Sequence, residues 1–335
     1  MTSYSYTTYV TTWGNNPFDQ IKDMANKQVL QSNTRIVLAF ASFNFESTNY
    51  IPGISGGITI DDIQQITNFV HSAGAKISLS IGGATYPFTG SSLYNKPGDL
   101  ANNINQVLNI CGFDGVDFDI EDYYLNVSSD FTNQAASLIN TLKNLNSELY
   151  ITLTTAGQAW NQGCYQQNLL NLTIGNINAW QPMEYDLWIQ SGSTYYDQIV
   201  WDLNFYLKTW GVSSDKIILG LMPGLDDMNH LLTLQDALNF TTVVKNNNLQ
   251  GIMTWDADID STGPDGNAPY SYSLGIQSLL KKTTNTNNSG NTHLLEVCEL
   301  KKNRIKGLSE NINNNLNQHN NIISDYKKNH SHRKR

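Results

Sequence analysis

Carboxylic acids stand at every second position near the end of the segment Asp-Gly-Val-Asp-Phe-Asp-Ile-Glu, residues 114–121. In a β-strand, Asp117, Asp119 and Glu121 would project from one face, because residues two apart point the same way. The apolar residues between them would pack on the opposite side. Carboxylates held this close cannot all ionise easily, so at least one should keep its proton near neutral pH. The pattern indicates a proton-transfer site rather than a solvent-facing acidic strand.

The order of the acids along the strand suggests a different role for each of them. Glu121 comes last and should lie nearest the mouth of the site, where it could give a proton to a leaving group as a general acid. Asp119 would share or exchange that proton. Asp117 would lie deeper and set the charge on Asp119.

The elements that position these acids can be predicted from the alternation of apolar runs. Residues 1 to about 280 contain eight strand-like runs: Tyr9–Trp13, Arg35–Phe43, Lys76–Ile81, Gly115–Glu121, Tyr150–Thr155, Ala179–Tyr185, Lys216–Met222 and Gly251–Trp255. Helical periodicity is present in Asp61–Ala73, Asp99–Cys111, the run after Ser129, Gln235–Asn246 and Tyr272–Lys281. This alternation predicts an α/β fold with a parallel sheet covered by helices. The length suits one barrel of roughly 250 residues, and a doubly wound open sheet is the alternative on this pattern alone.

The acidic run resembles the Asp-Gly-x-Asp-x-Asp-x-Glu signature of family 18 glycoside hydrolases, the chitinases and their relatives. All five fixed positions match, from Asp114 to Glu121. The resemblance implies a (β/α)8 barrel with this motif on its fourth strand. It extends to the ends of other strands: Ser80-Ile81-Gly82-Gly83 matches the family's Ser-x-Gly-Gly, and Met183-Glu184-Tyr185-Asp186 resembles its Met-x-Tyr-Asp.

Single residues carry the rest of the resemblance. Trp255 ends the eighth strand and matches the family's tryptophan that lies beneath the bound sugar. Trp13 stands where the family often has an aromatic residue on the first strand. Gln181 shares its strand parity with Met183 and Tyr185, so these side chains should point inward together. The substrate-binding residues that we expect are Asp186, Met183, Gln181, Trp255, Trp13, Ser80, Gly82 and Gly83.

The resemblance implies substrate-assisted retention, an exception to the scheme with two protein carboxylates. The 2-acetamido oxygen of N-acetylglucosamine would attack its own anomeric carbon. Glu121 would protonate the glycosidic oxygen and later deprotonate water. Asp119 would accept from the acetamido N–H, Asp117 would tune Asp119, and Tyr185 would donate its hydroxyl near the acetamido oxygen, with Asp186 assisting.

Three functions are compatible with this site. The first is a chitinase that cleaves β-1,4 linkages of N-acetylglucosamine polymers, with internal cleavage favoured. The second is an endo-β-N-acetylglucosaminidase that acts on N-glycans with the same acidic motif. The third is a non-catalytic chitin-binding lectin on the same barrel, which the presence of Glu121 disfavours because such proteins usually lose the terminal acid.

Other chemistries have little support in the sequence. Cys111, Cys164 and Cys298 show neither close pairing nor metal-ligand spacing, and Cys111 is expected to be a core residue at a helix end. The histidines form no His-x-x-x-His pair, and no phosphate-binding glycine motif is present. We therefore expect neither a cofactor nor a metal.

Composition divides the chain into a catalytic barrel at 1–282 and a tail at 283–335. Residues 1–280 hold 9 Lys and Arg against 25 Asp and Glu, a net −16, and residues 281–335 hold 11 against 4, a net +7, which together give the chain's −9. About two dozen residues separate the seventh and eighth strands, so the small α+β domain that some family members insert there should be absent. We expect the barrel to bind a sugar polymer and not nucleic acid. The Asn-rich, basic tail reads as a linker and a disordered or partly helical extension.

Two features bear on location. The first residues, Met-Thr-Ser-Tyr-Ser-Tyr, lack the basic start and apolar core of a signal peptide, whereas the implied function favours an extracellular protein. No run reaches the roughly 18 apolar residues of a membrane span. We expect a monomer.

Overall fold

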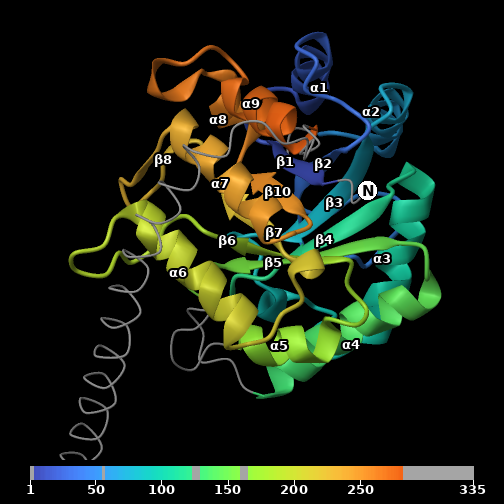
Figure 1. The fold of residues 1–335 in the computed structure, drawn as a ribbon. Helices are drawn as coiled ribbons and strands as arrows, with labels where there is room; N and C mark the ends of the chain where they lie inside the picture. Colours follow the sequence, from blue (N-terminus) through green and yellow to red (C-terminus); the bar gives the residue numbers. More distant parts are fainter. Residues whose placement is uncertain (1–3, 55–56, 123–128, 159–164, 282–335) are drawn as a thin grey trace, which may run out of the picture. The chain divides into compact units, whose positions relative to one another are not determined.

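The computed structural model describes residues 4–54, 57–122, 129–158 and 165–281. Its centre is a closed barrel of parallel strands in the order β1-β10-β7-β6-β5-β4-β3-β2 (Figure 1). The eight strands are β1 (Ser5–Thr11), β2 (Thr34–Ala41), β3 (Lys76–Gly82), β4 (Gly115–Asp119), β5 (Tyr150–Ala156), β6 (Ala179–Met183), β7 (Ile218–Leu221) and β10 (Gly251–Thr254). The predicted (β/α)8 barrel is confirmed.

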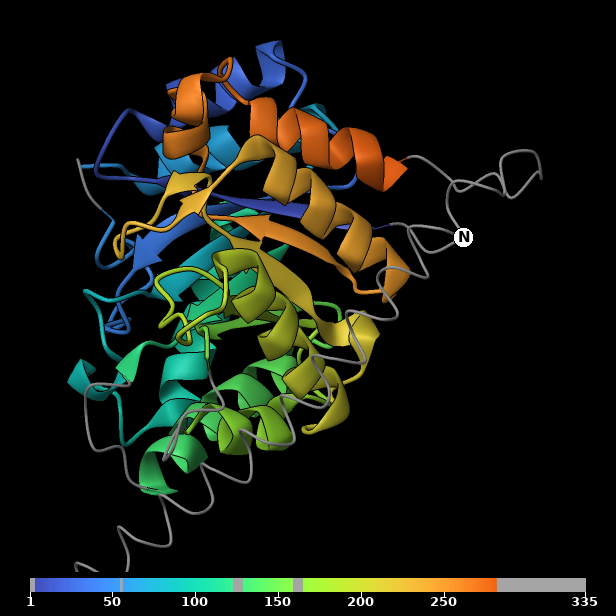
Figure 2. The same ribbon diagram turned by 60° about the vertical axis from the view of Figure 1, so that its left-hand side comes forward.

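Helices surround the barrel. They are α1 (Pro17–Asn26), α2 (Ile60–Ser72), α3 (Pro97–Cys111), α4 (Ser129–Leu145), α5 (Gln166–Thr173), α6 (Tyr195–Lys208), α7 (Leu234–Asn246), α8 (Ala257–Ser261) and α9 (Ser271–Lys281). The turned view shows α7 and α9 side by side over the outside of the barrel (Figure 2). Thr59, Thr194 and Thr233 begin α2, α6 and α7 with capping boxes, which satisfy backbone N–H groups that would otherwise lack partners.

The main apolar core lies between the strands and the helices. On β4, Val116 and Phe118 point into this layer and are fully buried, as the alternation in the acidic run predicts. Cys111 is also buried there, at the last residue of α3. The acids of β4 therefore face the interior of the barrel because their neighbours pack outward.

The interior of the barrel has an apolar half and a polar half. A separate apolar cluster comes from β1, β2, β6, β7 and β10, and includes Tyr9, Phe40 and Met183. The inward positions of β3, β4 and β5 are instead polar: Ser78 and Ser80, Asp117 and Asp119, and Thr152 and Thr154 are all buried. Burying so many polar groups together costs free energy unless they bond to one another, so this half of the barrel marks the site.

Several strand bounds differ from the prediction. The first strand begins at Ser5 rather than Tyr9, because Tyr6 already pairs with Thr34 of β2 and Ile252 of β10. β4 ends at Asp119 and β6 at Met183, so Glu121 and Tyr185 lie just beyond their strands.

The predicted absence of an inserted domain before α7 agrees with the structure. Between β7 and α7 the chain makes only a short hairpin, with β8 (Gly224–Leu225) antiparallel to β9 (Leu231–Leu232). The predicted tail, Cys164 and Cys298 lie outside the described residues.

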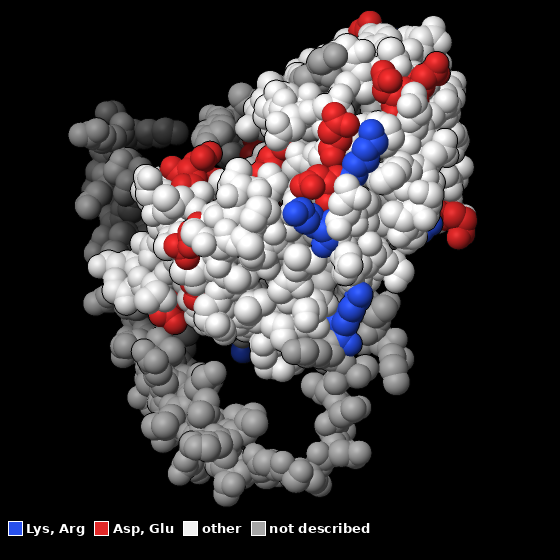
Figure 3. All heavy atoms as spheres, turned by 90° about the horizontal axis from the view of Figure 1, so that it is seen from above, with Lys and Arg blue, Asp and Glu red and all other residues white. Residues whose placement is uncertain are grey.

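Charged side chains occupy a small part of the face drawn in Figure 3. On the face drawn in Figure 3, the basic side chains are few and scattered, and they do not gather into one area. Within the described part of the chain, none of the helices has the length and apolar character needed to cross a membrane.

Candidate active site

Asp117 is the centre of the polar half of the barrel. Its carboxylate is fully buried and accepts hydrogen bonds from five side chains on four other strands. The donors are Tyr9 Oη at 2.8 Å, Ser80 Oγ at 2.7 Å, Thr152 Oγ1 at 2.6 Å, Thr154 Oγ1 at 2.7 Å and Gln181 Nε2 at 3.3 Å. Burial raises the pKa of Asp117, and the hydroxyl donors act in the opposite direction by stabilising its charged form. Asp117 is thus a fixed anchor at the bottom of the site.

Asp119 has a very different environment. It is 3 % exposed, and its Oδ1 has no hydrogen-bond partner among the described residues. Its pKa is raised well above the usual range by burial first and then by the nearby charges of Glu121 and Asp117. A buried carboxyl oxygen without a donor is costly in the free protein. It is the arrangement expected of a group that meets its partner only when a ligand is bound.

Glu121 is half-buried and held from both sides by its neighbours. The carbonyl of Ile120 accepts from Tyr165 Oη at 2.7 Å, and the N–H of Ile120 donates to the Thr154 carbonyl at 3.0 Å. On the other side, Asp122 accepts from the N–H groups of Phe88 and Thr89 at 3.0 and 3.1 Å. These bonds fix the backbone around Glu121 beyond the end of β4.

The paired glycines of β3 allow the strands to come close at the mouth of the site. Gly82 pairs with Asp119, and a Cβ at Gly82 would lie 2.0 Å from the Asp119 carbonyl oxygen. A Cβ at Gly83 would lie 2.6 Å from the ring of Phe40, and the Gly83 N–H donates to the Asp119 carbonyl at 2.9 Å. Both glycines have positive φ, at 121° and 72°. The sequence signal for close backbone approach is therefore explained by Asp119 and Phe40.

The residues of β6 and of the segment that follows it divide between the interior and the rim. Gln181 is buried and donates to Thr154 Oγ1 at 2.8 Å, and Met183 belongs to the apolar interior cluster. Tyr185 is also buried there, and burial together with Asp119 and Glu121 raises the pKa of its hydroxyl well above the usual range. The three inward residues thus come together as the strand parity predicts.

Asp186 lies on the rim and is exposed. Its N–H donates to Asp226 Oδ2 at 2.8 Å, and its own Oδ1 accepts from the Asp227 N–H at 2.7 Å. This pair of bonds ties the loop after β6 to the β8–β9 hairpin. The carboxylate of Asp186 therefore has a structural task that the sequence did not indicate.

Aromatic rings form the wall opposite the acids. Phe40 stacks on both Trp13 and Trp255, with centroid distances of 5.8 and 5.5 Å and interplanar angles of 20° and 14°. The two tryptophan rings also meet each other at 6.3 Å, so the three rings form one cluster. Tyr9 meets Trp255 edge-on at 5.3 Å. Trp13 remains 54 % exposed. Flat, partly exposed rings beside a polar cluster suit a ligand with one apolar and one hydroxyl-bearing face.

Sequence reasoning missed several residues of this site. Tyr9 and Phe40 carry no motif, although Tyr9 shares its strand parity with Trp13. Thr152 and Thr154 could have been found, because they alternate with Ile151 and Leu153, which pack against the helices outside the barrel.

Asp256 gives a test of the electrostatics of the site. It follows Trp255, caps α8 by accepting from the Ile259 N–H at 2.8 Å, and burial raises its pKa to about 6. The folded protein therefore binds a proton that the unfolded chain releases near pH 4, so this group's stabilisation is lost as pH rises from about 4 through 6. Asn caps helices as well as Asp. We expect Asp256→Asn to gain stability relative to the wild type by roughly 2 to 3 kcal/mol between pH 4 and pH 8. Thermal melts across this range would refute this if the difference between the two proteins stayed constant.

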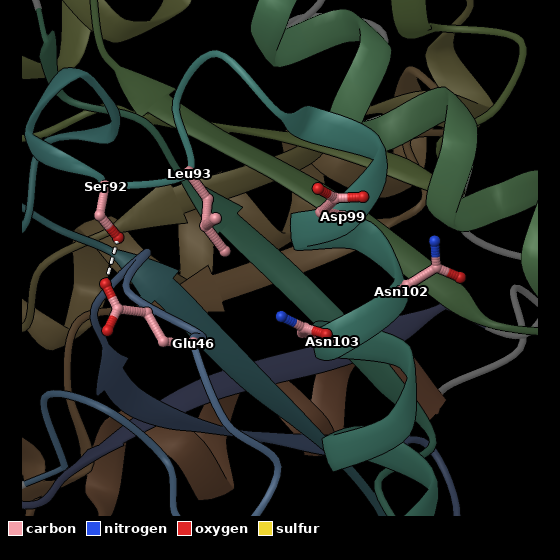
Figure 4. A pocket seen from close by; sticks show the side chains of 6 residues that line it. All are labelled: Glu46, Ser92, Leu93, Asp99, Asn102 and Asn103. Atoms are coloured by element: carbon pink, nitrogen blue, oxygen red, sulfur yellow. Dashed lines mark hydrogen bonds between the residues drawn. The ribbon is translucent and has the colours of Figure 1, made fainter.

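A hollow lies apart from these residues. It has a volume of about 420 Å³ and is lined by Glu46, Ser92, Leu93, Asp99, Asn102 and Asn103 (Figure 4). Ser92 Oγ donates to Glu46 Oε1 at 2.6 Å, and the amides and Asp99 come from α3. The hollow shares no lining residue with the acidic site. In the part of the chain that the structure describes, His, Cys, Asp and Glu form no group of three or more suited to a metal ion.

The comparisons with known proteins agree with this geometry. The model of glycosyl hydrolases family 18 matches residues 5–222. No curated protein sequence matches the chain. Similar solved structures include active domain 2 of a thermostable chitinase from Pyrococcus furiosus, complexed with chito-oligosaccharides, at 16 % identity, 85 % coverage of this chain, 97 % of that chain and TM-score 0.68. A family 18 chitinase from Pseudoalteromonas aurantia is similar at 21 % identity, with 82 % of this chain and 99 % of that chain covered and a TM-score of 0.63.

Human YKL-39 is described as a pseudo-chitinase with retained chitooligosaccharide binding properties. It is similar at 15 % identity, with 83 % of this chain and 100 % of that chain covered and a TM-score of 0.64. At these identities the structural likeness shows the fold alone. The family model covers most of the barrel, from β1 through the end of β7, and it includes the acidic motif and the residues after β6. The chain therefore belongs to glycosyl hydrolases family 18.

Proposed function

We propose that this protein hydrolyses β-1,4 linkages of N-acetylglucosamine polymers by substrate-assisted retaining catalysis, with Glu121 as general acid and base. One observation carries the proposal: the buried Oδ1 of Asp119 has no donor in the described residues, while the neighbouring Asp117 is fully bonded. A substrate that brings an N–H group to this point, as a 2-acetamido sugar does, would satisfy Asp119. A sugar with a hydroxyl there would also donate, but it would lack the internal nucleophile.

The proposed reaction assigns one step to each of these residues. The acetamido carbonyl oxygen attacks the anomeric carbon of its own sugar while the bond to the glycosidic oxygen breaks. Glu121 gives its proton to that oxygen, and the leaving chain departs as an alcohol. Asp119, accepting from the acetamido N–H, stabilises the positive charge on the resulting ring. Water then attacks the same carbon as its bond to the acetamido oxygen breaks, Glu121 takes the proton from the water, and the acetamido group and the original configuration are both restored.

Tyr185 and the aromatic wall orient the substrate. The Tyr185 hydroxyl lies within the field of Asp119, Glu121, Asp186 and Asp256, and its raised pKa keeps it protonated as a donor. Trp255 lies under the proposed sugar site, with its ring stacked on Phe40. Ring contact with the apolar face of the sugar would complement the hydrogen bonds from the acidic side.

Cleavage within the polymer is the mode that this architecture supports best. The segment between β7 and α7 adds only the β8–β9 hairpin to the rim, so no inserted domain walls the groove there. An open groove admits a chain anywhere along its length. Early products of mixed length from a soluble chitin derivative would support this mode, and disaccharide as the sole early product would refute it.

Trp13 should contribute binding without chemistry. Its ring is stacked on Phe40 and half-exposed, so Trp13→Ala removes a contact made equally in the ground state and the transition state. We expect KM for chitooligosaccharides to rise about tenfold, with kcat nearly unchanged. Steady-state kinetics would show this, with Leu172→Ala as a control, because Leu172 is similarly exposed but lies on α5. A fall in kcat with unchanged KM would contradict the assignment.

Product analysis on two substrates tests the proposed function. Chitooligosaccharides should be cut, with the new reducing end first appearing as the β-anomer, and a high-mannose glycoprotein should stay intact. Release of the glycan from the glycoprotein, with no action on chitooligosaccharides, would assign the protein to N-glycan hydrolysis instead. Binding of chitooligosaccharides without turnover would assign it to the lectins.

A further inference from the structure

Two buried carboxyl groups meet behind the segment that carries Tyr185 and Asp186. Glu184 follows β6 with the opposite parity to Tyr185, so its side chain leaves the barrel interior and faces α6. Asp202 lies on α6, and both side chains are fully buried. The proposed reaction uses neither of them.

The hydrogen bonds around the pair leave one position to be filled. Tyr206 Oη donates to Glu184 Oε1 at 2.9 Å, and Gln198 Nε2 donates to both carboxyl oxygens of Asp202 at 3.3 and 3.2 Å. Glu184 Oε2 meets no donor among the described residues, yet the Glu184 side chain is within hydrogen-bonding reach of Asp202. Two carboxyl oxygens can bond to each other only through a proton carried by one of them.

The side chains that donate the printed hydrogen bonds to the two carboxyl groups, Tyr206 and Gln198, are neutral. Tyr195, at the start of α6, donates to the Glu184 carbonyl at 3.0 Å, and Asp186 and Asp226 lie within electrostatic range of Tyr195. His230 stacks on Tyr195 at 5.2 Å but is paired with Asp226 at 3.1 Å. Burial, and then Asp202, raise the pKa of Glu184 well above its usual range. A doubly ionised pair would be both desolvated and mutually repelled.

We propose that Glu184 and Asp202 share one proton, and that this pair holds the segment after β6 against α6 and so positions Tyr185. The Glu184 N–H donates to the Gly220 carbonyl of β7 at 3.0 Å, and its carboxyl group accepts from Tyr206 of α6 at 2.9 Å. The residue next to Tyr185 is therefore held by β7 through its backbone and by α6 through its side chain. Glu184 is thus a positioning residue that acts through its neighbour. The effect on catalysis rests on the proposed function, whereas the shared proton does not.

The shared proton has a defined pH signature. The unfolded chain releases it near pH 4, while the folded protein keeps it to a higher pH. Stability from the pair is therefore complete below about pH 4 and is lost as pH rises through the raised pKa of the pair. Raising the pH should weaken the attachment of the β6 segment to α6.

Melting temperatures between pH 5 and pH 9 test the shared proton. Glu184→Gln has the shape of the protonated acid: its oxygen can accept from Tyr206 and its amide can donate to Asp202. The wild-type melting temperature should fall as pH rises through the window where the pair titrates. We expect Glu184→Gln and Asp202→Asn each to make this fall shallower by roughly 2 °C per pH unit. The double variant should change the slope of melting temperature against pH by no more than either single variant does, because only one proton is shared. Asp61→Asn, at an exposed acid of α2, is the control.

Two results would overturn the shared proton: an unchanged slope in Glu184→Gln, or a double variant with twice the effect of the single ones. The positioning role is tested by rescue. Glu184→Ala should lower kcat about tenfold at unchanged KM, and Glu184→Gln should restore it. Wild-type kcat in Glu184→Ala would overturn that role. If no substrate is cleaved, the proposed function fails, while the melting curves still decide the shared proton.

Discussion

Glu121→Gln should lower kcat on chitooligosaccharides by about 10³-fold or more, because the amide can neither give a proton to the glycosidic oxygen nor take one from water. The substitution keeps the size and hydrogen-bonding shape of the side chain. The backbone around it stays fixed by Tyr165 and Asp122. Binding should therefore persist, and calorimetry with a chitooligosaccharide should give a dissociation constant within about threefold of that of the wild type at a pH where the wild type is inactive.

A matched control is Glu148→Gln, at an exposed glutamate before β5. It should leave kcat and KM unchanged. Turnover of Glu121→Gln within tenfold of the wild type would mean that another group is the acid. Loss of both binding and turnover, with an unchanged melting temperature, would mean that Glu121 binds substrate rather than donating a proton.

Asp119→Asn should make the protein more stable and much less active. The buried Asp119 has an oxygen without a donor and lies beside Asp117 and Glu121. Folding at neutral pH must therefore either bury a repelled charge or bind a proton at Asp119, and an amide avoids both costs. Loss of the carboxylate should cost about 10²-fold or more in kcat, because the acetamido group is no longer oriented and its developing charge is no longer balanced. Paired measurements of kcat and melting temperature at pH 7 test both effects.

The matched comparison is Asp117→Asn, the same change two residues earlier. Asp117 accepts from five side chains, so an amide there would place N–H donors against hydroxyl donors and should lower the melting temperature. Opposite shifts in melting temperature at these two positions are the expected result. Equal losses of stability at both positions would contradict the contrast between an anchored and an unsatisfied carboxylate.

Much of this architecture could be predicted from local patterns. The alternation in residues 114–121 placed Asp117 and Asp119 on the inner face of the barrel, because Val116 and Phe118 have only one side on which to pack. The same logic turned Gln181, Met183 and Tyr185 inward, where Met183 and Tyr185 join the apolar cluster and Gln181 donates to Thr154. Strand ends were less predictable, since Glu121 and Tyr185 lie past the last ladder bonds although their alternation continues. Periodicity reports which way side chains point, and it does not report where a neighbouring strand stops pairing.

Contacts between distant strands could not be read from the sequence. Tyr9 reaches Asp117 across the barrel, and nothing near residue 9 indicates an acid 108 positions later. Phe40 was hidden in an apolar run, and only its closeness to Gly83 and its stacking on two tryptophans reveal its place in the site. The sequence motif included Glu184, but it did not indicate the partner of Glu184, because Asp202 lies on the helix that returns to cover β6.

The participation of the acetamido group is tested most directly by a substrate series. In aryl chitobiosides whose reacting acetamido group carries zero to three fluorine atoms, each fluorine makes the carbonyl oxygen a weaker nucleophile without changing the leaving group. If the sugar displaces its own aglycone, kcat/KM should fall steeply with each added fluorine. A rate independent of fluorination would show that the nucleophile comes from the protein or from water, and would contradict the proposed roles of Asp119 and Glu121.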